Sequence, residues 1–301
     1  ELQRMSGAGL AVGQSVTNKD IKVVGITSAN SNGIVGLVSL VAGVDDSQVT
    51  FETTASTFHT LAVQADNGVV VGTDVSTTGA TMYLDADLDD SSTSDSTNTL
   101  RFADGVEMKT QYLITLEASS SMITPAGTLT LKSGSGVVVL DSVLGADTAK
   151  SLVINADFDS AGDGTITVVT GKVITSNKSD VTLTAWDLDL DGSLTSGTKT
   201  ISVHGSQAAQ TIGLGATPKD MHVADEELGR MTSTGGLRMG GSAGGSVVVD
   251  GITAAGSNAV SPVVTLVASF GELTHISFAT AASTFNGLAV QADDGVILEV
   301  D

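Results

Sequence analysis

A long internal repeat constrains the fold of this chain more than any other feature. The stretch TTASTFHTLAVQADNGVVV at residues 53–71 returns as TAASTFNGLAVQADDGVIL at residues 280–298, with thirteen of the 19 aligned positions identical. The match extends backwards: ELQRM at 1–5 returns as ELGRM at 227–231, and VVGITSANSN at 23–32 returns as VDGITAAGSN at 249–258, always at an offset of 226 or 227 residues. The chain therefore comprises one full repeat unit, residues 1–226, and the start of the next, residues 227–301.

Short alternating segments between the two copies indicate an all-β fold. Examples are TLAVQAD (60–66), TLTLKSG (128–134) and SLVINAD (151–157), each closed by turn-forming residues. Successive segments lie roughly 10 to 20 residues apart, which is typical of short strands separated by turns. The composition agrees, because Val, Ile, Leu and Thr dominate, 35 residues are Gly and aromatic residues make up only 3%.

A sandwich, a barrel and a β-solenoid all accommodate many short strands. Sandwiches and barrels close at a fixed number of strands, so repeated units would need boundaries, and the sequence between Gly215 and Leu237 contains no Pro-rich or charged linker. We therefore predict a β-solenoid (β-helix) of short stacked strands that forms a continuous rod. The alternation places Leu61, Val63 and their counterparts Leu288 and Val290 in its interior.

Only MHVADEELGRM, residues 221–231, has a briefly helical pattern. Its counterpart in the first copy, ELQRM, runs into GAGL, and Gly is unfavourable inside a helix. We expect a turn with a short strand at this position.

The charge excludes several classes of partner. Lys and Arg number 13 against 34 Asp and Glu, which gives a formal net charge of −21. Such a field repels phosphate backbones, so we expect no nucleic-acid partner. Cysteine is absent, which excludes disulfides and thiolate metal sites, and no apolar run approaches the 18 residues that a membrane helix needs. We expect no membrane span here and take the chain to be an interior window of a longer protein.

Closely spaced acidic residues are candidate calcium ligands. Asp187, Asp189 and Asp191 precede Gly192, and Asp157, Asp159 and Asp163 form a second group. Calcium takes six to eight oxygen ligands, and a D-x-D-x-D-G loop supplies several of them. The helix–loop–helix version is excluded, because it needs Glu at position twelve and the chain has Thr198 there. The alternative is that D-L-D-L-D is a strand with its leucines inward and its carboxylates in solvent.

No set of residues marks a catalytic site. His59 is replaced by Asn286 in the second copy, whereas a repeat-wide active site would keep its histidine. No G-x-S-x-G turn precedes a helix, and GGSAGG at 240–245 lacks the context of a phosphate-binding loop. We therefore predict no catalytic residue and no enzymatic activity.

Some polar residues do survive the duplication, and we interpret them as coil corners, with a ligand site as the alternative. These residues are Glu1/Glu227 with Arg4/Arg230, and Gln64/Gln291 with Asp66/Asp293. One glycosylation sequon, Asn177-Lys178-Ser179, stands between two strands, and Asn177 is a candidate glycan acceptor if the protein is secreted.

The segments TLTAWDLDLDGSLTSGTKTISVHGS (182–206), GLAVG (9–13) and ITSANSN (26–32) resemble coils of filamentous-haemagglutinin-type surface proteins. They are also similar to giant tandem-repeat proteins of marine microbes and algae. This resemblance implies a secreted, right-handed β-solenoid that serves as an extracellular or cell-surface fibre. Alternatives are an adhesin or carbohydrate-binding stalk, with glycans as partners, and a polysaccharide-active β-helix enzyme.

Uncovered terminal coils give a physical reason to expect self-association. A solenoid cut inside a repeat leaves unpaired backbone groups and apolar surface at both end coils. We therefore expect the units to assemble head to tail into a filament.

Overall fold

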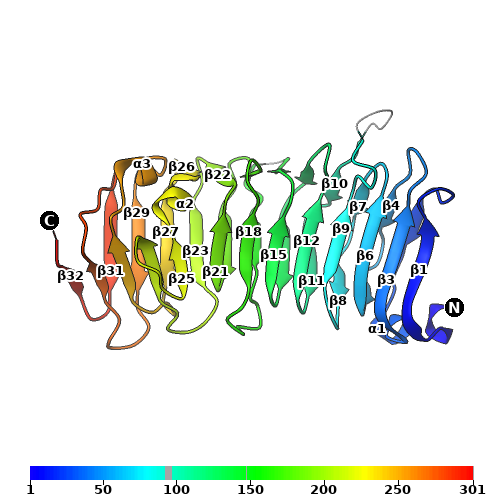
Figure 1. The fold of residues 1–301 in the computed structure, drawn as a ribbon, viewed down its shortest axis with the longest axis horizontal. Coiled ribbons are helices and arrows are strands. Elements are labelled where there is room, and N and C mark those ends of the chain that lie inside the picture. Colours follow the sequence, from blue (N-terminus) through cyan, green and yellow to red (C-terminus); the bar gives the residue numbers. More distant parts are fainter. Residues whose placement is uncertain (92–96, 147, 301) are drawn as a thin grey trace. The chain divides into compact units, whose positions relative to one another are not determined.

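The computed structural model describes residues 1–91, 97–146 and 148–300. They form two compact units, Glu1–Asp147 and Thr148–Asp301. Within each unit, consecutive strands turn from one sheet to the next and every described strand pairing is parallel, as in a β-solenoid (Figure 1). The predicted all-β solenoid of short stacked strands is thus confirmed. The continuity of its coils as one rod, and the division at residues 226 and 227, stay predictions.

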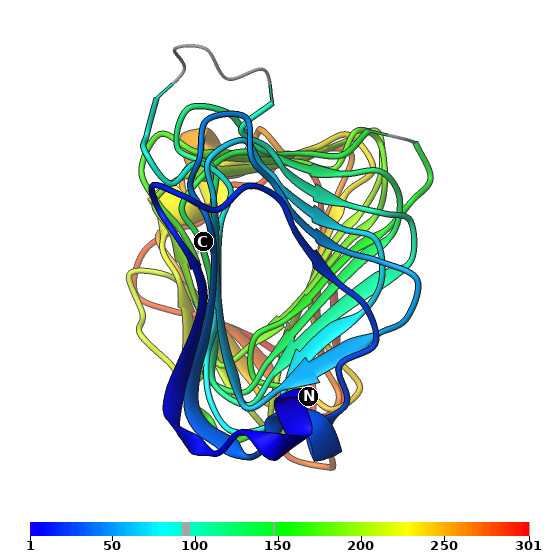
Figure 2. The same cartoon turned by 90° about the vertical axis from the view of Figure 1, so that its right-hand side faces the viewer.

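The first unit has three parallel sheets, and in the view of Figure 2 its coils, coloured blue to green, follow one another around a common outline. The first sheet contains β1 (Gly7–Gln14), β3 (Ile34–Ala42), β6 (Thr60–Ala65), β9 (Met82–Asp85), β12 (Leu113–Glu117) and β15 (Gly136–Val139). The second contains β2 (Ile21–Val23), β4 (Val49–Phe51), β7 (Val69–Val71), β10 (Leu100–Phe102), β13 (Ile123–Pro125) and β16 (Val143–Leu144). The third contains β5 (Ser56–Phe58), β8 (Val75–Thr77), β11 (Val106–Thr110) and β14 (Leu129–Ser133). Two short helical segments, η1 (Leu2–Arg4) and α1 (Ser28–Ser31), lie in the first coils.

The second unit repeats this arrangement with strands of four sheets. The longest row contains β17 (Leu152–Asn155), β20 (Val181–Ala185), β23 (Ile201–Gly205), β27 (Leu237–Gly241), β29 (Val264–Ala268) and β31 (Leu288–Ala292). Shorter rows contain β18 (Thr165–Val168) with β21 (Asp187–Leu190), and β19 (Val173–Thr175) with β22 (Ser193–Gly197) and β26 (Met231–Ser233). The remaining row contains β25 (Met221–Val223), β24 (Ile212–Gly215), β28 (Val247–Asp250), β30 (Ile276–Phe278) and β32 (Val296–Leu298). The short helices α2 (Asp225–Gly229) and α3 (Ala254–Ser257) form corners.

Strand alternation builds the core, as the sequence predicts. In β6 the side chains of Leu61 and Val63 are 1% and 0% exposed, while the residues between them are half-buried. The equivalent residues of β31 are on the same face of the strand, but they are less covered. Leu288 is 38% exposed and Val290 is half-buried, because β31 is the last strand of its sheet among the described residues.

The two copies of the repeat adopt the same backbone pairing. The strand pairs β1–β3, β3–β6, β2–β4 and β4–β7 have counterparts in β27–β29, β29–β31, β28–β30 and β30–β32. The matching registers are Leu10↔Val38 with Leu237↔Val264, Val38↔Leu61 with Val264↔Leu288, Ile21↔Val49 with Val247↔Ile276, and Val49↔Val69 with Ile276↔Val296. The sequence duplication therefore specifies a duplicated coil.

A pair of glycines shows how closely the copies agree. Gly13 and Gly240 are the last residues but one of the equivalent strands β1 and β27, with φ values of 87° and 83°. A Cβ atom at either position would lie 2.1 Å from a carbonyl oxygen of the neighbouring coil, that of Val41 or Val267. Only glycine combines this left-handed conformation with such a close approach, which explains why GLAVG and GLRMG both end in it.

Candidate functional site

The acidic stretch at 187–191 is a strand with its leucines inward. Leu188 and Leu190 are each 5% exposed, whereas Asp189 faces solvent. Asp187 Oδ1 accepts hydrogen bonds from the backbone N–H groups of Leu188 (3.0 Å) and His222 (2.9 Å). Burial raises the pKa of Asp187, although these hydrogen bonds oppose the rise. This carboxylate thus fastens β21 to β25 across two coils.

Asp191, at the outer end of this stretch, and Asp157, in the second acidic group, have different environments. The Asp191 side chain is 62% exposed and lies 3.9 Å from Arg230 Nη1. Asp157 is 1% exposed, and it accepts hydrogen bonds from Ala161 N (3.0 Å), Gly162 N (3.0 Å) and Ser206 Oγ (2.5 Å). Its pKa is raised because the carboxyl is buried. Asp159 and Asp163 are exposed.

In the ranges that the structure describes, no group of three or more His, Asp or Glu side chains is arranged to hold a metal ion. N–H and O–H groups already donate to the carboxylates of Asp157 and Asp187, so a cation would compete with them for lone pairs. Calcium binding at 187–191 and 157–163 stays a prediction with a direct test.

The sequon lies in a tight turn. Asn177 has a φ of 54° and is half-buried, while Ser179 is 0% exposed. The Ser179 hydroxyl accepts a hydrogen bond from Lys150 N (2.9 Å), so it is part of the coil packing. Glycosylation of Asn177 stays a prediction.

Aspartates that precede strands bind the next coil through its backbone. Each accepts an N–H hydrogen bond from a residue 20 to 33 positions later: Asp20 from Gln48 (2.9 Å), Asp74 from Glu107 (2.8 Å), Asp104 from Thr128 (2.8 Å) and Asp180 from Thr200 (3.0 Å). Sequence reasoning missed this role. The sequence does contain a sign of this role, since an Asp stands directly before an alternating segment in D-I-K-V (20–23) and in D-V-T-L (180–183).

Buried Ser and Thr hydroxyls stabilise the turns at strand ends, because each donates a hydrogen bond to the backbone carbonyl three residues later. These bonds are Thr77 to Ala80 (2.8 Å), Ser133 to Gly136 (2.5 Å), Ser176 to Ser179 (2.6 Å), Ser196 to Lys199 (2.5 Å) and Ser233 to Gly236 (3.1 Å). A hydroxyl in this position satisfies a carbonyl that the end of the strand leaves unpaired. The abundance of Ser and Thr at strand ends therefore has a structural cause.

The duplicated motifs meet at a corner made by a one-turn helix. In the first copy, Ser31 Oγ of α1 donates to Thr57 O (2.8 Å), and Ile26 N donates to Ser56 Oγ (3.2 Å). In the second copy, Ser257 Oγ of α3 donates to Thr284 O (2.8 Å), and Ile252 N donates to Ser283 Oγ (3.0 Å). The I-T-x-A-x-S-N motif of one coil is thus bound to the S-T-F motif of the next coil, which explains why both are repeated.

The ELGRM motif of the second copy holds an edge strand. Glu227 accepts hydrogen bonds from Leu190 N (3.0 Å) and Ala224 N (2.8 Å), and Arg230 Nη1 donates to Leu190 O (2.8 Å). The two side chains therefore bond both backbone groups of Leu190, as a neighbouring strand would. The expected turn at 221–231 is wrong in part, since Asp225–Gly229 forms the one-turn helix α2, whose first turn is fixed by the bond from Ala224 N to Glu227.

A polar ladder crosses three coils of the first unit. Gln64, Asp85 and Glu117 are register partners on β6, β9 and β12. Tyr83 donates its hydroxyl to Glu117 Oε2 (2.5 Å) and lies 3.2 Å from Asp85 Oδ2, to which Gln64 Nε2 also donates (3.2 Å). Burial raises the pKa of Asp85, and burial together with the neighbouring carboxylates raises that of Tyr83. The donors Tyr83 and Gln64 separate carboxylates that would otherwise repel each other.

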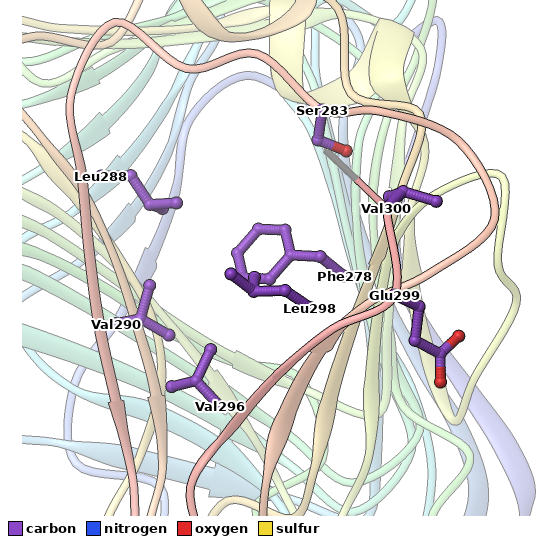
Figure 3. A pocket seen from close by; sticks show the side chains of 8 residues that line it. All are labelled: Phe278, Ser283, Leu288, Val290, Val296, Leu298, Glu299 and Val300. Carbon is purple, nitrogen blue, oxygen red and sulfur yellow. The ribbon is translucent and has the colours of Figure 1, made fainter.

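A hollow in the second unit lies inside its last coil. It has a volume of about 660 Å³ and is lined by Phe278, Ser283, Leu288, Val290, Val296, Leu298, Glu299 and Val300. Figure 3 shows the side chains of Leu288 and Val290 pointing from β31 into the coil, toward the side where Phe278 and Leu298 lie. The described lining residues are mostly apolar, and Glu299 is the charged residue among them.

No protein-family model, no curated protein and no solved structure matches this chain. The filamentous-haemagglutinin-type resemblance rests on sequence pattern alone and stays a prediction. No helix among the described residues has the length and apolar character needed to cross a membrane.

Proposed function

We propose that this protein is a structural component of an extracellular fibre or cell-surface filament, built from head-to-tail β-solenoid repeats and without enzymatic activity. The observation that carries the proposal is that the duplication preserves the coil. Strand registers, the two close-approach glycines and the α1 and α3 corner bonds recur in both copies. Selection for a scaffold, rather than for a reaction, accounts for this pattern.

Chemically active side chains differ between the copies, in support of the same proposal. Asp20 accepts a hydrogen bond from Gln48 N (2.9 Å), and at the equivalent place Ser246 Oγ accepts one from His275 N (3.2 Å). The hydrogen bond to the backbone N–H is kept, although the carboxylate of Asp20 corresponds to the hydroxyl of Ser246 and the imidazole of His275 corresponds to the amide of Gln48. A catalytic site repeated along a filament would need its acid and base in each copy.

The test is to express chains that contain one, two and three tandem copies of residues 1–226 and to image them by electron microscopy. Register partners in successive coils lie between 19 residues apart, at Ser56 and Val75, and 37 residues apart, at Leu194 and Met231. Each added copy of 226 residues should therefore lengthen the particle by about 40 Å at the β spacing of about 4.8 Å per coil. Separate globules joined by flexible segments would contradict the proposal.

The proposed extracellular location of the protein needs a separate experiment. Antibodies against residues 1–301 should label intact, non-permeabilised source cells or the fibres around them. Labelling that requires permeabilisation would overturn the extracellular part of the proposal and leave the solenoid architecture unaffected.

A further inference from the structure

A pocket opens on the second unit where the neighbouring strands β23 and β27 end (Figure 1). Its volume is about 280 Å³. In their sheet β23 lies between β20 and β27, and β27 lies between β23 and β29. Both strands therefore have a paired neighbour on each side, so the pocket does not depend on where the chain ends. The lining residues are His204, Gly205, Arg238, Gly240, Gly241, Ser242, Ala243 and Gly244.

Arg238 supplies a positive charge to this pocket. It stands on β27 between Leu237 and Met239, which are 1% and 0% exposed, so its exposed side chain lies on the outer face of the sheet. Arg101 and Arg230 donate hydrogen bonds within the chain, whereas the Arg238 guanidinium has no hydrogen bond or ion pair among the described residues. The described lining contains no Asp or Glu, although the chain has 34 of them. A guanidinium without a partner offers two parallel N–H donors to a carboxylate.

His204 presents one nitrogen of its ring to a further partner. Its Nδ1 lies 2.9 Å from Gly240 O. Because a carbonyl oxygen only accepts, Nδ1 carries the hydrogen, and Nε2 has no partner among the described residues. A Cβ atom at Gly241 would lie 3.3 Å from His204 Nδ1. Glycine at this position therefore leaves room beside the ring, and the ring is held in place by the bond to Gly240.

The turn that follows β27 adds backbone donors. It is closed by the bond from Gly244 N to Gly241 O (3.0 Å). The N–H groups of its central residues, Ser242 and Ala243, have no acceptor among the described residues. Successive N–H groups without acceptors favour a negatively charged or carbonyl oxygen beside them.

Hydroxyl groups surround Arg238 and His204 on the same face of the sheet. Arg238 is opposite Ser202 on β23 and Thr265 on β29, and His204 is opposite Thr184 on β20. These three residues are half-buried, and their hydroxyls have no hydrogen bond among the described residues. A hydroxyl both donates and accepts, as the hydroxyl groups of a sugar do.

The first copy of the repeat lacks these groups. GLAVGQ at 9–14 and GLRMGG at 236–241 occupy equivalent strands, so Ala11 corresponds to Arg238 and Gln14 corresponds to Gly241. The pocket therefore belongs to the second copy alone. The first copy also shows which substitutions this strand accommodates.

We propose that this pocket binds a small sugar acid, which carries one carboxylate and neighbouring hydroxyl groups. The carboxylate is bound by Arg238 and by the N–H groups of the turn, and His204 Nε2 accepts a hydrogen bond from a hydroxyl group of the ligand. A volume of about 280 Å³ lies just below the range for drug-sized ligands, which suits one sugar ring. A single charge is favoured, because a protein of charge −21 repels polyanions.

The test is a titration of the intact 301-residue chain with galacturonate, at a salt concentration of about 0.1 M that limits general repulsion to about 10 Å. The NMR signals of the imidazole Cε1–H groups are the readout. The chain has four histidines, so His204 reports on the pocket and His59, His222 and His275 are internal controls. We expect a saturable shift at His204 alone. Glucose has no carboxylate and acetate has no hydroxyl group, so each should bind at least about tenfold more weakly.

Substitutions taken from the first copy test the two main features of the pocket. Arg238→Ala removes the guanidinium, and Gly241→Gln places a side chain beside His204. Each should weaken galacturonate binding at least about tenfold. The matched control is Arg101→Ala, which removes an exposed arginine from the first unit and should change binding less than about twofold. A thermal melt of each variant confirms that it folds.

Unchanged binding in a folded Arg238→Ala variant, equal shifts at all four histidines, or no shift at His204 would overturn the inference. Polygalacturonate distinguishes a free sugar acid from an acidic polysaccharide, since the polymer should bind more weakly per carboxylate. Tighter binding of the polymer, or of inorganic phosphate, would overturn the assignment of a small sugar acid. The inference goes beyond the proposed filament and does not depend on it. Tandem copies that form separate globules would contradict the filament alone, and a failed titration would contradict the pocket alone.

Discussion

The motifs ELQRM and ELGRM begin the two copies of the repeat and have different environments. In the second copy, Leu228 and Met231 are 0% exposed, and Glu227 and Arg230 bond the backbone of Leu190. In the first copy, Leu2 is half-buried and Met5 is 46% exposed. Because the letters are nearly the same, the difference comes from the neighbouring coil. In a solenoid, burial is a property of the stack rather than of the residue.

The largest effect should separate Leu61 from its counterpart Leu288. Leu61→Ala removes a fully covered side chain and should lower the free energy of unfolding by about 2–4 kcal/mol. Leu288→Ala acts on a side chain that is 38% exposed, and it should cost less than about 1 kcal/mol. Denaturant unfolding of the two variants measures both values. Equal losses would show that the last coil is covered in solution.

The next comparison tests the hydrogen bonds of Glu227. Glu227→Ala leaves the N–H groups of Leu190 and Ala224 without their acceptor, and it should cost about 1–3 kcal/mol. Glu1→Ala, at the equivalent exposed position, should change stability by less than about 0.5 kcal/mol. Hydrogen exchange at Leu190 should accelerate in the first variant and remain unchanged in the second.

Buried and exposed acids should differ in their effect on pH dependence. The pKa of Asp187 is raised by burial, so the folded state holds its proton more tightly than the unfolded state does. Its contribution is therefore fully present below the ordinary value of about 3.9 and is lost as pH rises through the raised folded pKa. We expect the melting temperature to increase as pH falls from 7 through the raised folded pKa toward about 4.

Self-repulsion in a chain of charge −21 acts in the same direction, so the pH experiment needs a matched pair of variants. Asp189→Asn removes one exposed charge from the same strand, and Asp187→Asn removes the buried one. The increase in melting temperature should be smaller in Asp187→Asn than in Asp189→Asn. Equal slopes would show that general repulsion alone causes the effect.

A smaller loss of stability is expected at Asp20, because the second copy makes the equivalent hydrogen bond with a different side chain, that of Ser246. Asp20→Ala removes the acceptor of Gln48 N and should cost about 1 kcal/mol. Asp20→Ser introduces the group that the second copy has in Ser246, and it should cost less than about 0.5 kcal/mol. Thermal melting of the two variants distinguishes a required acceptor from a required charge.

The smallest effect is expected from removal of divalent cations. The carboxylates of Asp157 and Asp187 accept hydrogen bonds from the protein itself, so a bound cation adds little stability, and a chelator should lower the melting temperature by only about 1 °C at high ionic strength. A native-state ligand would raise the melting temperature when present. A decrease on chelation that Asp189→Asn abolishes would establish calcium binding at 187–191.

Local pattern was sufficient to predict most of the fold. Alternation with a period of two identifies inward residues such as Leu61 and Leu129 whatever the coil, because successive side chains of a strand point to opposite faces. The repeat predicted equivalent coils, and the matching registers of β6 and β31 agree with it. The hydrogen bonds between coils were harder to predict from the sequence, because the roles of Asp20 and Ser31 depend on partners in the next coil.

By itself, the sequence determined the faces of the strands, because these depend on neighbours along the chain, and it determined which motifs are duplicated. The tertiary structure alone decided which groups meet between coils. Register partners lie 21 residues apart at Leu61 and Met82 but 36 apart at Ile201 and Leu237, so no fixed spacing predicts them. Asp157 meets Ser206, Asp187 meets His222, and Leu288 remains exposed where Leu61 is buried. The physical reason is that lateral stacking, set by variable corner lengths, decides burial and hydrogen bonding in a solenoid.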